Sequence, residues 1–256
     1  MQSATQSAAD PVHRGSLVLD HGALHAWLVD LDAPSAAAAV RLDAAERARA
    51  ASYLRPQDGA RFAGSHAALR LVLAQYVGSE PGDLEFRVGP HGQPRLAADE
   101  VRFSLARSGG LALIAVSRGL VGADLERVAA RPGLADVAVA RFPAREAAYV
   151  AAGCCGSPTR SFYRHWTAKE AYLKAIGLGL AGLRDTELVC GARPVIWFAG
   201  RPVGGWPLSV ASTASGCVAS IIGELAVTSW RWLSFGRPLL LERPAGSHRW
   251  PTRARS

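Results

Sequence analysis

Apolar positions recur along the chain with two different periods, and these periods separate strands from helices. In the first half, residues 22–29 alternate between apolar and polar side chains, which predicts a strand. Residues 43–54 and 61–77 have the spacing of amphipathic helices, and we expect the turn-forming stretch 56–59 to break one from the other. Similar alternation and short apolar runs predict further strands over 85–88, 101–105, 111–117 and 120–128.

Helical spacing dominates the middle of the chain. It predicts helices over 134–141 and 144–151. Ser157 followed by Pro158 has the form of a helix start, with a capping serine and a proline in the first turn. We expect this helix to end at Gly177, because glycine commonly terminates helices. Strand patterns then return over 186–189, 195–199, 208–211, 217–222 and 227–233.

The order of these elements predicts the fold class. A β-α-α-β-β-β series is followed by α-α-β-β-β, so we expect an α+β protein with two pseudo-symmetric lobes. No internal sequence repeat supports the symmetry. The expected boundaries are a flexible leader over 1–18, an N-terminal lobe over 19–120, a C-terminal lobe over 121–236 and a basic, disordered tail over 237–256.

Composition narrows the class and location of the protein. The 256 residues are 49% hydrophobic, as in a globular protein, and no apolar run is long enough to span a membrane. The polar N-terminus lacks the apolar core of a signal peptide, so we expect a cytoplasmic protein. We separately expect a monomer. The net charge of +8 favours an anionic partner, but the basic residues are scattered. Nucleic acid binding is therefore an alternative motivated by charge alone, and we expect none.

The four cysteines show no metal-ligand spacing along the chain. Cys154 and Cys155 are adjacent, whereas Cys190 and Cys217 are isolated, and the histidines add no spacing typical of a metal site. We therefore expect neither a zinc site nor a disulfide framework, but buried or idle thiols.

Lysine is confined to one short segment. Of the 29 lysines and arginines, 27 are arginine, and the two lysines are Lys169 and Lys174, on either side of Glu170. A lysine ammonium can give up a proton when its pKa is lowered, which arginine cannot do. The pattern favours a site that needs an ammonium. The open alternatives are chance, a surface Glu–Lys pair, and a capping box formed by Thr167 and Glu170.

Two carboxylates share one face of the strand predicted near residue 124. Because side chains alternate in a strand, Asp124 and Glu126 point one way, and Ala123 and Leu125 point the other. This spacing is typical either of a strand with a solvated face or of a site for a hard cation such as Mg²⁺.

The two segments together resemble a known family. The sequence Gly-Ala-Asp-Leu-Glu over 122–126, followed by Trp-x-x-Lys-Glu-Ala-x-x-Lys over 166–174, resembles the larger, two-lobed class of 4′-phosphopantetheinyl transferases typified by Sfp. The resemblance covers roughly residues 20 to 235 and implies an active site between the two lobes. It implies a transferase that moves the phosphopantetheine arm of coenzyme A onto a serine of an apo acyl or peptidyl carrier protein, for fatty acid, polyketide or nonribosomal peptide synthesis.

The resemblance also implies roles for individual residues. Asp124, Glu126 and Glu170 would bind Mg²⁺ against the pyrophosphate, and Glu170 would also accept the serine proton. Lys174 would stabilise or protonate the leaving phosphate, and Lys169 would add charge to the phosphate site. The remaining candidate contacts to coenzyme A are Arg49, Arg61, Gly92, Gln93, Pro94 and Arg107.

This chain departs from the family in its nucleotide-binding segments. Ala106, Arg107 and Ser108 stand where Ser-His-Ser is usual, and Gln93 stands where lysine is common. Arg107 could replace the histidine as a phosphate ligand. The departure motivates a second hypothesis, a non-catalytic module that binds coenzyme A or a carrier protein.

Overall fold

A computed structural model gives the arrangement of most of the chain. It describes residues 17–20, 23–33, 40–89, 93–98, 101–191, 193–224, 229–235 and 241–242. The expected leader and basic tail lie almost wholly outside the described residues, so their expected flexibility stays a prediction.

Short elements with a long central helix make up the first half. In chain order they are β1 (Ala23–Asp30), α1 (Ala44–Ala51), α2 (Pro56–Val77), the 3-10 helix η2 (Pro81–Asp83), β2 (Phe86–Val88), β3 (Pro94–Leu96), β4 (Arg102–Ser108), β5 (Leu111–Ser117) and β6 (Val121–Arg127). Asp43 caps α1, accepting a hydrogen bond from the Glu46 amide while the Glu46 side chain accepts one from the Asp43 amide.

Three helices open the second half and strands close it. They are α3 (Leu134–Arg141), α4 (Ala144–Ala151), α5 (Pro158–Ile176), the 3-10 helix η3 (Gly179–Arg184), β7 (Thr186–Val189), β8 (Val195–Phe198), β9 (Arg201–Pro202), β10 (Leu208–Thr213), β11 (Cys217–Gly223), β12 (Ser229–Phe235) and β13 (Leu241–Glu242).

Two four-stranded sheets form the centre of the protein. One has the order β12-β1-β5-β4 and the other β13-β10-β11-β6. The pairs within them are antiparallel except for β1 and β12, which run parallel, with Ala23 opposite Ser229. The small sheets β2-β3 and β7-β8-β9 lie outside this centre.

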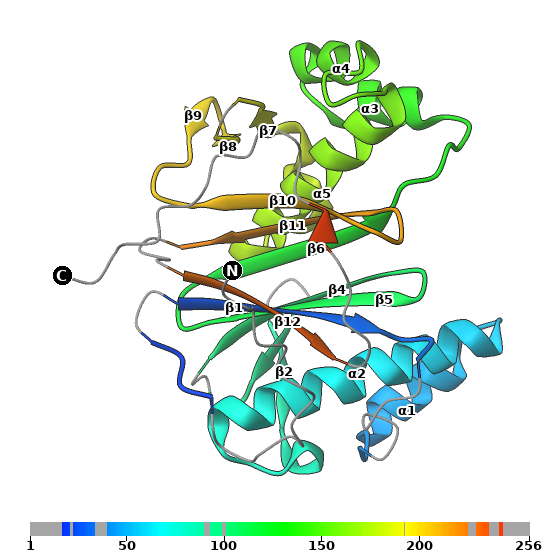
Figure 1. Cartoon of the computed structure of the whole chain (residues 1–256), viewed down its shortest axis with the longest axis vertical. Coiled ribbons are helices and arrows are strands. Elements are labelled where there is room, and N and C mark those ends of the chain that lie inside the picture. Colours follow the sequence, from blue (N-terminus) through cyan, green and yellow to red (C-terminus); the bar gives the residue numbers. More distant parts are fainter. Residues whose placement is uncertain are drawn as a thin grey trace, which may run out of the picture.

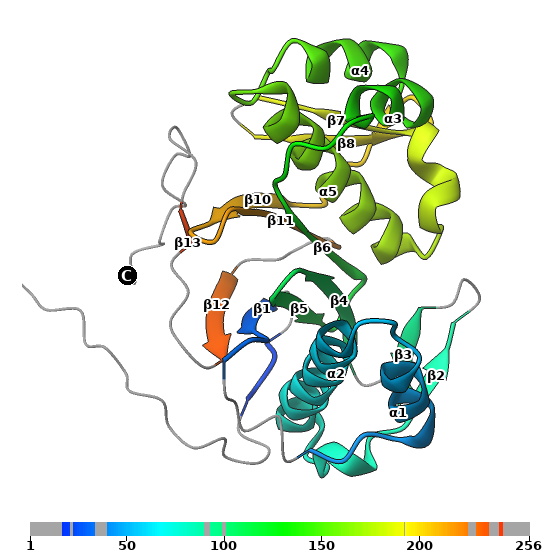
Figure 2. The same ribbon diagram turned by 90° about the vertical axis from the view of Figure 1, so that its right-hand side faces the viewer.

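The elements stack in four layers, helix, sheet, sheet and helix, which Figure 2 shows from the side. One cluster of buried side chains joins α2 to β1 and β5 and includes Leu69 and Ile114. A second joins α5 to β10 and β11 and includes Leu173 and Val210. The third lies between the sheets and includes Leu24 and Ile221. Because both faces of each sheet are covered, these strands are largely apolar.

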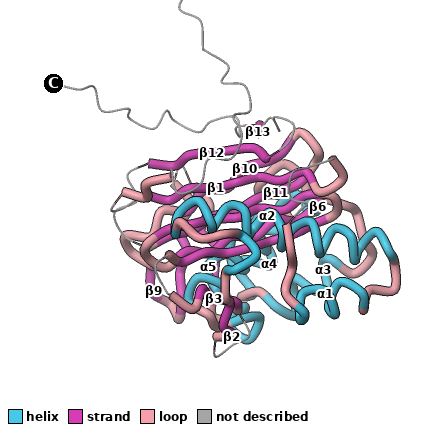
Figure 3. Tube along the Cα trace, turned by 90° about the horizontal axis from the view of Figure 1, so that it is seen from below, coloured by secondary structure: helices cyan, strands magenta, loops and turns pink. Residues whose placement is uncertain are grey.

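Helices α3 and α4 and the β7-β8-β9 sheet extend the α5 side of the molecule (Figure 1). Seen from below, the strands of the two central sheets lie in adjacent layers with α2 in front of them (Figure 3). The result is a mixed α/β structure built from several small, mainly antiparallel sheets. The pseudo-symmetry of two lobes stays a prediction.

One detail of the expected fold is wrong, and one strand has a partner that the sequence did not predict. The break between α1 and α2 falls at 52–55, before the proline, because Pro56 occupies the first turn of α2, where no intrahelical amide bond is lost. The strand expected over 227–233 lies within the range assigned to the C-terminal lobe, yet β12 pairs with β1 at the edge of the first sheet. Sequence order alone does not reveal such a return, because strand pairing depends on which edge is free.

Candidate active site

Strand β6 presents its two carboxylates to helix α5. Ala123 and Leu125 are buried between the two sheets. Asp124 and Glu126 therefore face away from that layer, as the alternation predicts. Asp124 is only 5% exposed, and Glu126 is half-buried. A solvated strand face is thus excluded for Asp124.

Helix α5 supplies the other side of the site. The Ser157 hydroxyl accepts a hydrogen bond from the Arg160 amide, and the helix ends at Gly177 with φ of 72°. Glu170 therefore lies within the helix, and the capping-box alternative for it is wrong. The Thr167 hydroxyl instead lies 2.8 Å from that of Ser220 on β11.

A glycine brings β6 and α5 into close contact. A Cβ atom added at Gly122 would lie 1.8 Å from the carbonyl oxygen of Ala171 and 2.7 Å from the amide nitrogen of Ala175. No side chain fits in that space, so only glycine allows this approach. Both contacted residues lie on α5 between or beside Glu170 and Lys174. The glycine before Asp124 is therefore what places the strand carboxylates within reach of the helix.

Lys174 and Ser108 hold the two carboxylates of β6. The Lys174 ammonium donates to Asp124 Oδ1 at 2.5 Å, which excludes the simple surface pair with Glu170. The Ser108 hydroxyl at the end of β4 donates to Glu126 Oε2 at 2.9 Å and accepts from the amide of Arg127 at 2.9 Å. The second oxygen of Asp124 is buried and has no hydrogen-bond partner among the described residues.

The pKa values of the three carboxylates are raised because the groups are partly buried and lie close together. Burial raises the pKa of Glu170 to about 7, and the negative charges of Asp124 and Glu126 add to the effect against the opposing charge of Lys174. Burial also raises the pKa of Asp124 and of Glu126. Ionising all three carboxylates together is unfavourable unless additional positive charge is present.

These residues fit a hard divalent cation. Carboxylate oxygens are the ligands that Mg²⁺ prefers, and the buried, unpartnered oxygen of Asp124 is a free donor to such an ion. One ammonium, that of Lys174, offsets only part of the charge of three carboxylates.

Lys169 lies elsewhere. Its side chain is fully buried, its ammonium donates to Glu146 Oε2 at 2.6 Å, and it lies 3.9 Å from the centre of the Phe142 ring. Burial lowers its pKa, and the negative charge of Glu146 opposes that shift. The structure therefore brings Lys174 together with the carboxylates of β6 and Glu170 but does not bring Lys169 to them.

Arg107 lies on β4 next to Ser108 and against aromatic rings. Its guanidinium donates to the Tyr53 hydroxyl at 3.3 Å and lies 5.0 Å from the centre of the Phe62 ring. Tyr53 also contacts Arg49, whose guanidinium is 5.4 Å from the ring centre. Arg49, Tyr53 and Arg55 line an open pocket of about 340 Å³.

Arg61 is the most constrained of the other arginine candidates. It donates twice to Asp32, at 2.8 and 2.6 Å, on a part of the surface that is accessible to solvent. A phosphate would have to compete with this bidentate pair. Arg61 is therefore placed less favourably than Arg107 as an anion ligand.

Gln93 and Pro94 lie beside the C-terminal end of α5. Gln93, Pro94 and Lys174 line one small cavity of about 30 Å³. A Cβ atom at Gly177 would lie 2.4 Å from Gln93 Nε2, so the glutamine packs against the end of the helix. Gln93 Oε1 is buried without a partner among the residues that the structure describes. Gly92 lies outside the described residues.

Sequence patterns missed the residues that support the site. Ser104 accepts from the Ala123 amide at 2.9 Å, and Ser108 bonds both Glu126 and the next amide, so two hydroxyls join β4 to β6. The sequence shows that Ser104 and Ser108 are four positions apart, but it does not show which groups they bond.

Within the described ranges, no helix is both long enough and apolar enough to cross a bilayer.

Comparison with known proteins agrees with this site. Residues 120–203 match the 4′-phosphopantetheinyl transferase superfamily, a segment that contains β6 and α5. The transferase HetI of Nostoc sp. is 32% identical over 225 residues, which cover 85% of this chain and 92% of HetI. A putative 4′-phosphopantetheinyl transferase of Synechocystis sp. is 37% identical over 161 residues, 61% of this chain and 65% of that protein.

A more distant relative extends the comparison. The 4′-phosphopantetheinyl transferase of Bacillus subtilis is 27% identical over 141 residues, which cover 55% of this chain and 62% of that protein. The resemblance inferred from the two motifs is confirmed. Because HetI is matched over almost its whole length at more than 30% identity, this chain belongs to the 4′-phosphopantetheinyl transferase superfamily and is a transferase.

Proposed function

We propose that this protein transfers the 4′-phosphopantetheine arm of coenzyme A to a serine of an apo acyl or peptidyl carrier protein. The observation that carries the proposal is the meeting of Asp124, Glu126, Glu170 and Lys174 at one half-buried place, with one buried oxygen of Asp124 unpartnered. Three carboxylates and one ammonium would repel a pyrophosphate. The site can bind one only if a metal cation lies between the carboxylates and the phosphates. Mg²⁺ held by the three carboxylates would supply that positive charge.

The chain's own residues account for the proton transfers. In the proposed reaction the serine hydroxyl oxygen bonds to the phosphorus that carries the pantetheine, and the bond from that phosphorus to the bridging oxygen breaks. Glu170, whose pKa is raised to about 7 by burial, is suited to accept the serine proton directly or through water. Lys174 donates a hydrogen bond or proton to the departing phosphate, and adenosine 3′,5′-bisphosphate leaves.

Binding of coenzyme A would use the arginines near β4. Arg107 and Arg49 both contact Tyr53, and together they offer positive charge for phosphate groups. Gln93 and Pro94, which line a cavity with Lys174, would contact the same molecule closer to the reacting phosphates. We infer that the enzyme is monomeric and cytoplasmic. The positive net charge of +8 would speed encounter with an acidic carrier protein.

The first test is a transfer assay followed by intact mass. An apo carrier protein incubated with coenzyme A, Mg²⁺ and this protein should gain the mass of one phosphopantetheine arm, and omission of Mg²⁺ should prevent the gain. Glu170→Gln and Lys174→Ala should each lower turnover by about 100-fold or more with an unchanged circular dichroism spectrum. Glu85→Gln, a change at an exposed glutamate, is the matched control.

Two outcomes would contradict the proposal. Turnover by Glu170→Gln within a few-fold of that of the parent protein would exclude Glu170 as the acceptor of the serine proton. Binding of coenzyme A in a calorimeter, with no transfer to any of several carriers, would instead support the non-catalytic module that the Ala106-Arg107-Ser108 segment motivated.

A further inference from the structure

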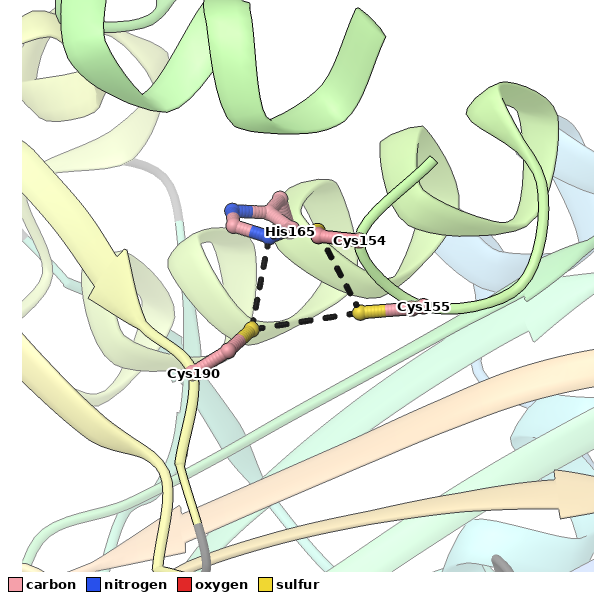
Figure 4. A group of neighbouring side chains, drawn as sticks. All are labelled: Cys154, Cys155, His165 and Cys190. Carbon is pink, nitrogen blue, oxygen red and sulfur yellow. Dashed lines mark hydrogen bonds between the residues drawn. The ribbon is translucent and has the colours of Figure 1, made fainter. Parts of the chain in front are cut away.

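A second cluster of reactive side chains lies apart from the carboxylates of β6. Figure 4 shows Cys154 and Cys155 in the turn after α4, His165 on α5 and Cys190 directly after β7. Their four ligand atoms, three sulfurs and one imidazole nitrogen, all lie within 4.8 Å of one another. Chain spacing predicted no such set, because its members come from three separate elements.

Four of the six distances between these atoms are close to the edges of a tetrahedral metal site. With zinc–sulfur bonds of about 2.3 Å and a zinc–nitrogen bond of about 2.0 Å, a tetrahedron has sulfur–sulfur edges of about 3.8 Å and sulfur–nitrogen edges of about 3.5 Å. The observed Sγ–Sγ distances are 3.6 Å between Cys154 and Cys155 and 3.9 Å between Cys155 and Cys190. His165 Nε2 is 3.5 Å from Cys154 Sγ and 3.4 Å from Cys190 Sγ.

The histidine is oriented as metal-bound histidines are. Its Nδ1 lies 2.8 Å from Glu146 Oε1, so Nε2 is directed at the thiols. Glu146 is held in turn by the Lys169 ammonium at 2.6 Å and by the Leu188 amide at 2.9 Å. A carboxylate behind a ligating histidine fixes the ring and makes it a better ligand. In this arrangement the buried Glu146–Lys169 pair orients the histidine ligand.

Neither packing nor a disulfide accounts for the whole cluster, although Cys190 packs partly against the core cluster around α5. Cys154 is exposed, and Cys155 and Cys190 are half-buried, whereas Cys217 is buried in the layer between the sheets. A cysteine that only fills the core is expected to resemble Cys217. The Sγ–Sγ distances of 3.6 and 3.9 Å are also far from the 2.05 Å of a disulfide.

We propose that Cys154, Cys155, Cys190 and His165 Nε2 bind one Zn²⁺ in a tetrahedral site. Four protein ligands leave no open position, so the ion is structural and does not take part in chemistry. It joins the turn after α4 and the end of β7 to the first half of α5. Glu170 follows His165 on the same helix, so the site steadies the segment that carries the active-site glutamate. The proposal does not depend on the proposed transfer reaction.

Metal content of the intact protein tests the proposal directly. Protein purified without chelators, or apo protein reconstituted with Zn²⁺ and desalted, should hold one zinc per chain by plasma mass spectrometry. Cys155→Ser and Cys190→Ser should each hold at least tenfold less. Cys217→Ala, which removes the remaining cysteine, is the matched control and should hold one full equivalent.

Cobalt distinguishes the cysteine cluster from the carboxylate site. Co²⁺ added to the apo protein should give intense visible bands of tetrahedral cobalt and thiolate-to-cobalt charge transfer, which carboxylate ligands cannot produce. Both signals should survive in Asp124→Asn and disappear in Cys155→Ser. Glu146→Gln, which keeps all four ligands, should weaken zinc binding about 10- to 100-fold in a chelator competition.

Three results would overturn the assignment. The first is folded apo protein that takes up neither Zn²⁺ nor Co²⁺. The second is equal metal loss in Cys217→Ala and Cys155→Ser. The third is cobalt bands typical only of oxygen ligands. Variants are compared only when their circular dichroism spectra match that of the parent protein, and Cys154→Ser, at an exposed position, is the substitute if Cys155→Ser does not fold.

Discussion

At the scale of single residues, the two lysines of this arginine-rich chain have different surroundings on one helix. Lys174 is half-buried and bonds Asp124, whereas Lys169 is fully buried against Glu146 and Phe142. Five positions on a helix separate two side chains by more than a third of a turn, so they face different elements. The sequence pattern correctly marked this segment, but it could not distinguish an ammonium at the site from one in the core.

Replacing Lys169 by methionine separates these roles. Lys169→Met should destabilise the protein by about 2 kcal/mol or more in urea unfolding, because it leaves a buried carboxylate without its cation. The double variant with Glu146→Gln should recover part of that loss. Turnover of the folded fraction should change only a few-fold. A large rise in KM for coenzyme A would instead support the phosphate-site role that the resemblance implied for Lys169.

At the scale of elements, the contact between β6 and α5 positions the candidate site. Element identity was largely predictable: α3, α4 and β7 have the expected bounds, and the helix opened by Pro158 ends at Gly177 as expected. The strands β3 and β9 were missed, because two or three residues are too few to show a period. The depth of approach at Gly122 was also hidden, since a glycine in a strand does not specify its neighbour.

Gly122→Ala tests this contact. The added methyl group would overlap the Ala171 carbonyl at 1.8 Å, so β6 and α5 must separate. We expect a loss of about 1–3 kcal/mol in the free energy of unfolding, together with a fall in transfer activity. Gly204→Ala is the control, because a Cβ there meets nothing within 4 Å. Equal stability and activity of the two variants would show that the close approach is unimportant.

At the scale of the whole molecule, tertiary pairing was the least predictable feature. The metal-like geometry of the cysteine cluster and the support of Glu126 by Ser108 join residues from different elements. Periodicity reports which face of an element is buried, but not what covers it. The motif resemblance supplied the grouping of Asp124, Glu126 and Glu170, which no local pattern contains.

The acid stability of the fold is expected to depend on Glu46. Burial alone would raise its pKa, but hydrogen bonds from His66, the Asp43 amide and Arg70 lower it to about 2. A carboxylate with a lowered folded pKa stabilises the protein above its unfolded pKa of 4.5, and this stabilisation is lost as the pH falls from about 4.5 towards 2.

Glu46→Gln measures that contribution. Urea unfolding of the parent protein should show a loss of about 2–3 kcal/mol over this window in addition to what the variant shows. Glu85→Gln, at an exposed position, should follow the parent curve. Parallel curves for the parent protein and Glu46→Gln would assign the acid sensitivity to other carboxylates.

The parallel pairing of β1 with β12 has a consequence for protein synthesis. The ribosome makes β1 well before β12, because roughly two hundred residues separate Ala23 from Ser229. The nascent first sheet therefore waits with one edge of β1 open while the rest of the chain emerges. This sheet can be completed only after β12 has left the ribosome. A chaperone that shields strand edges would act most usefully in that interval.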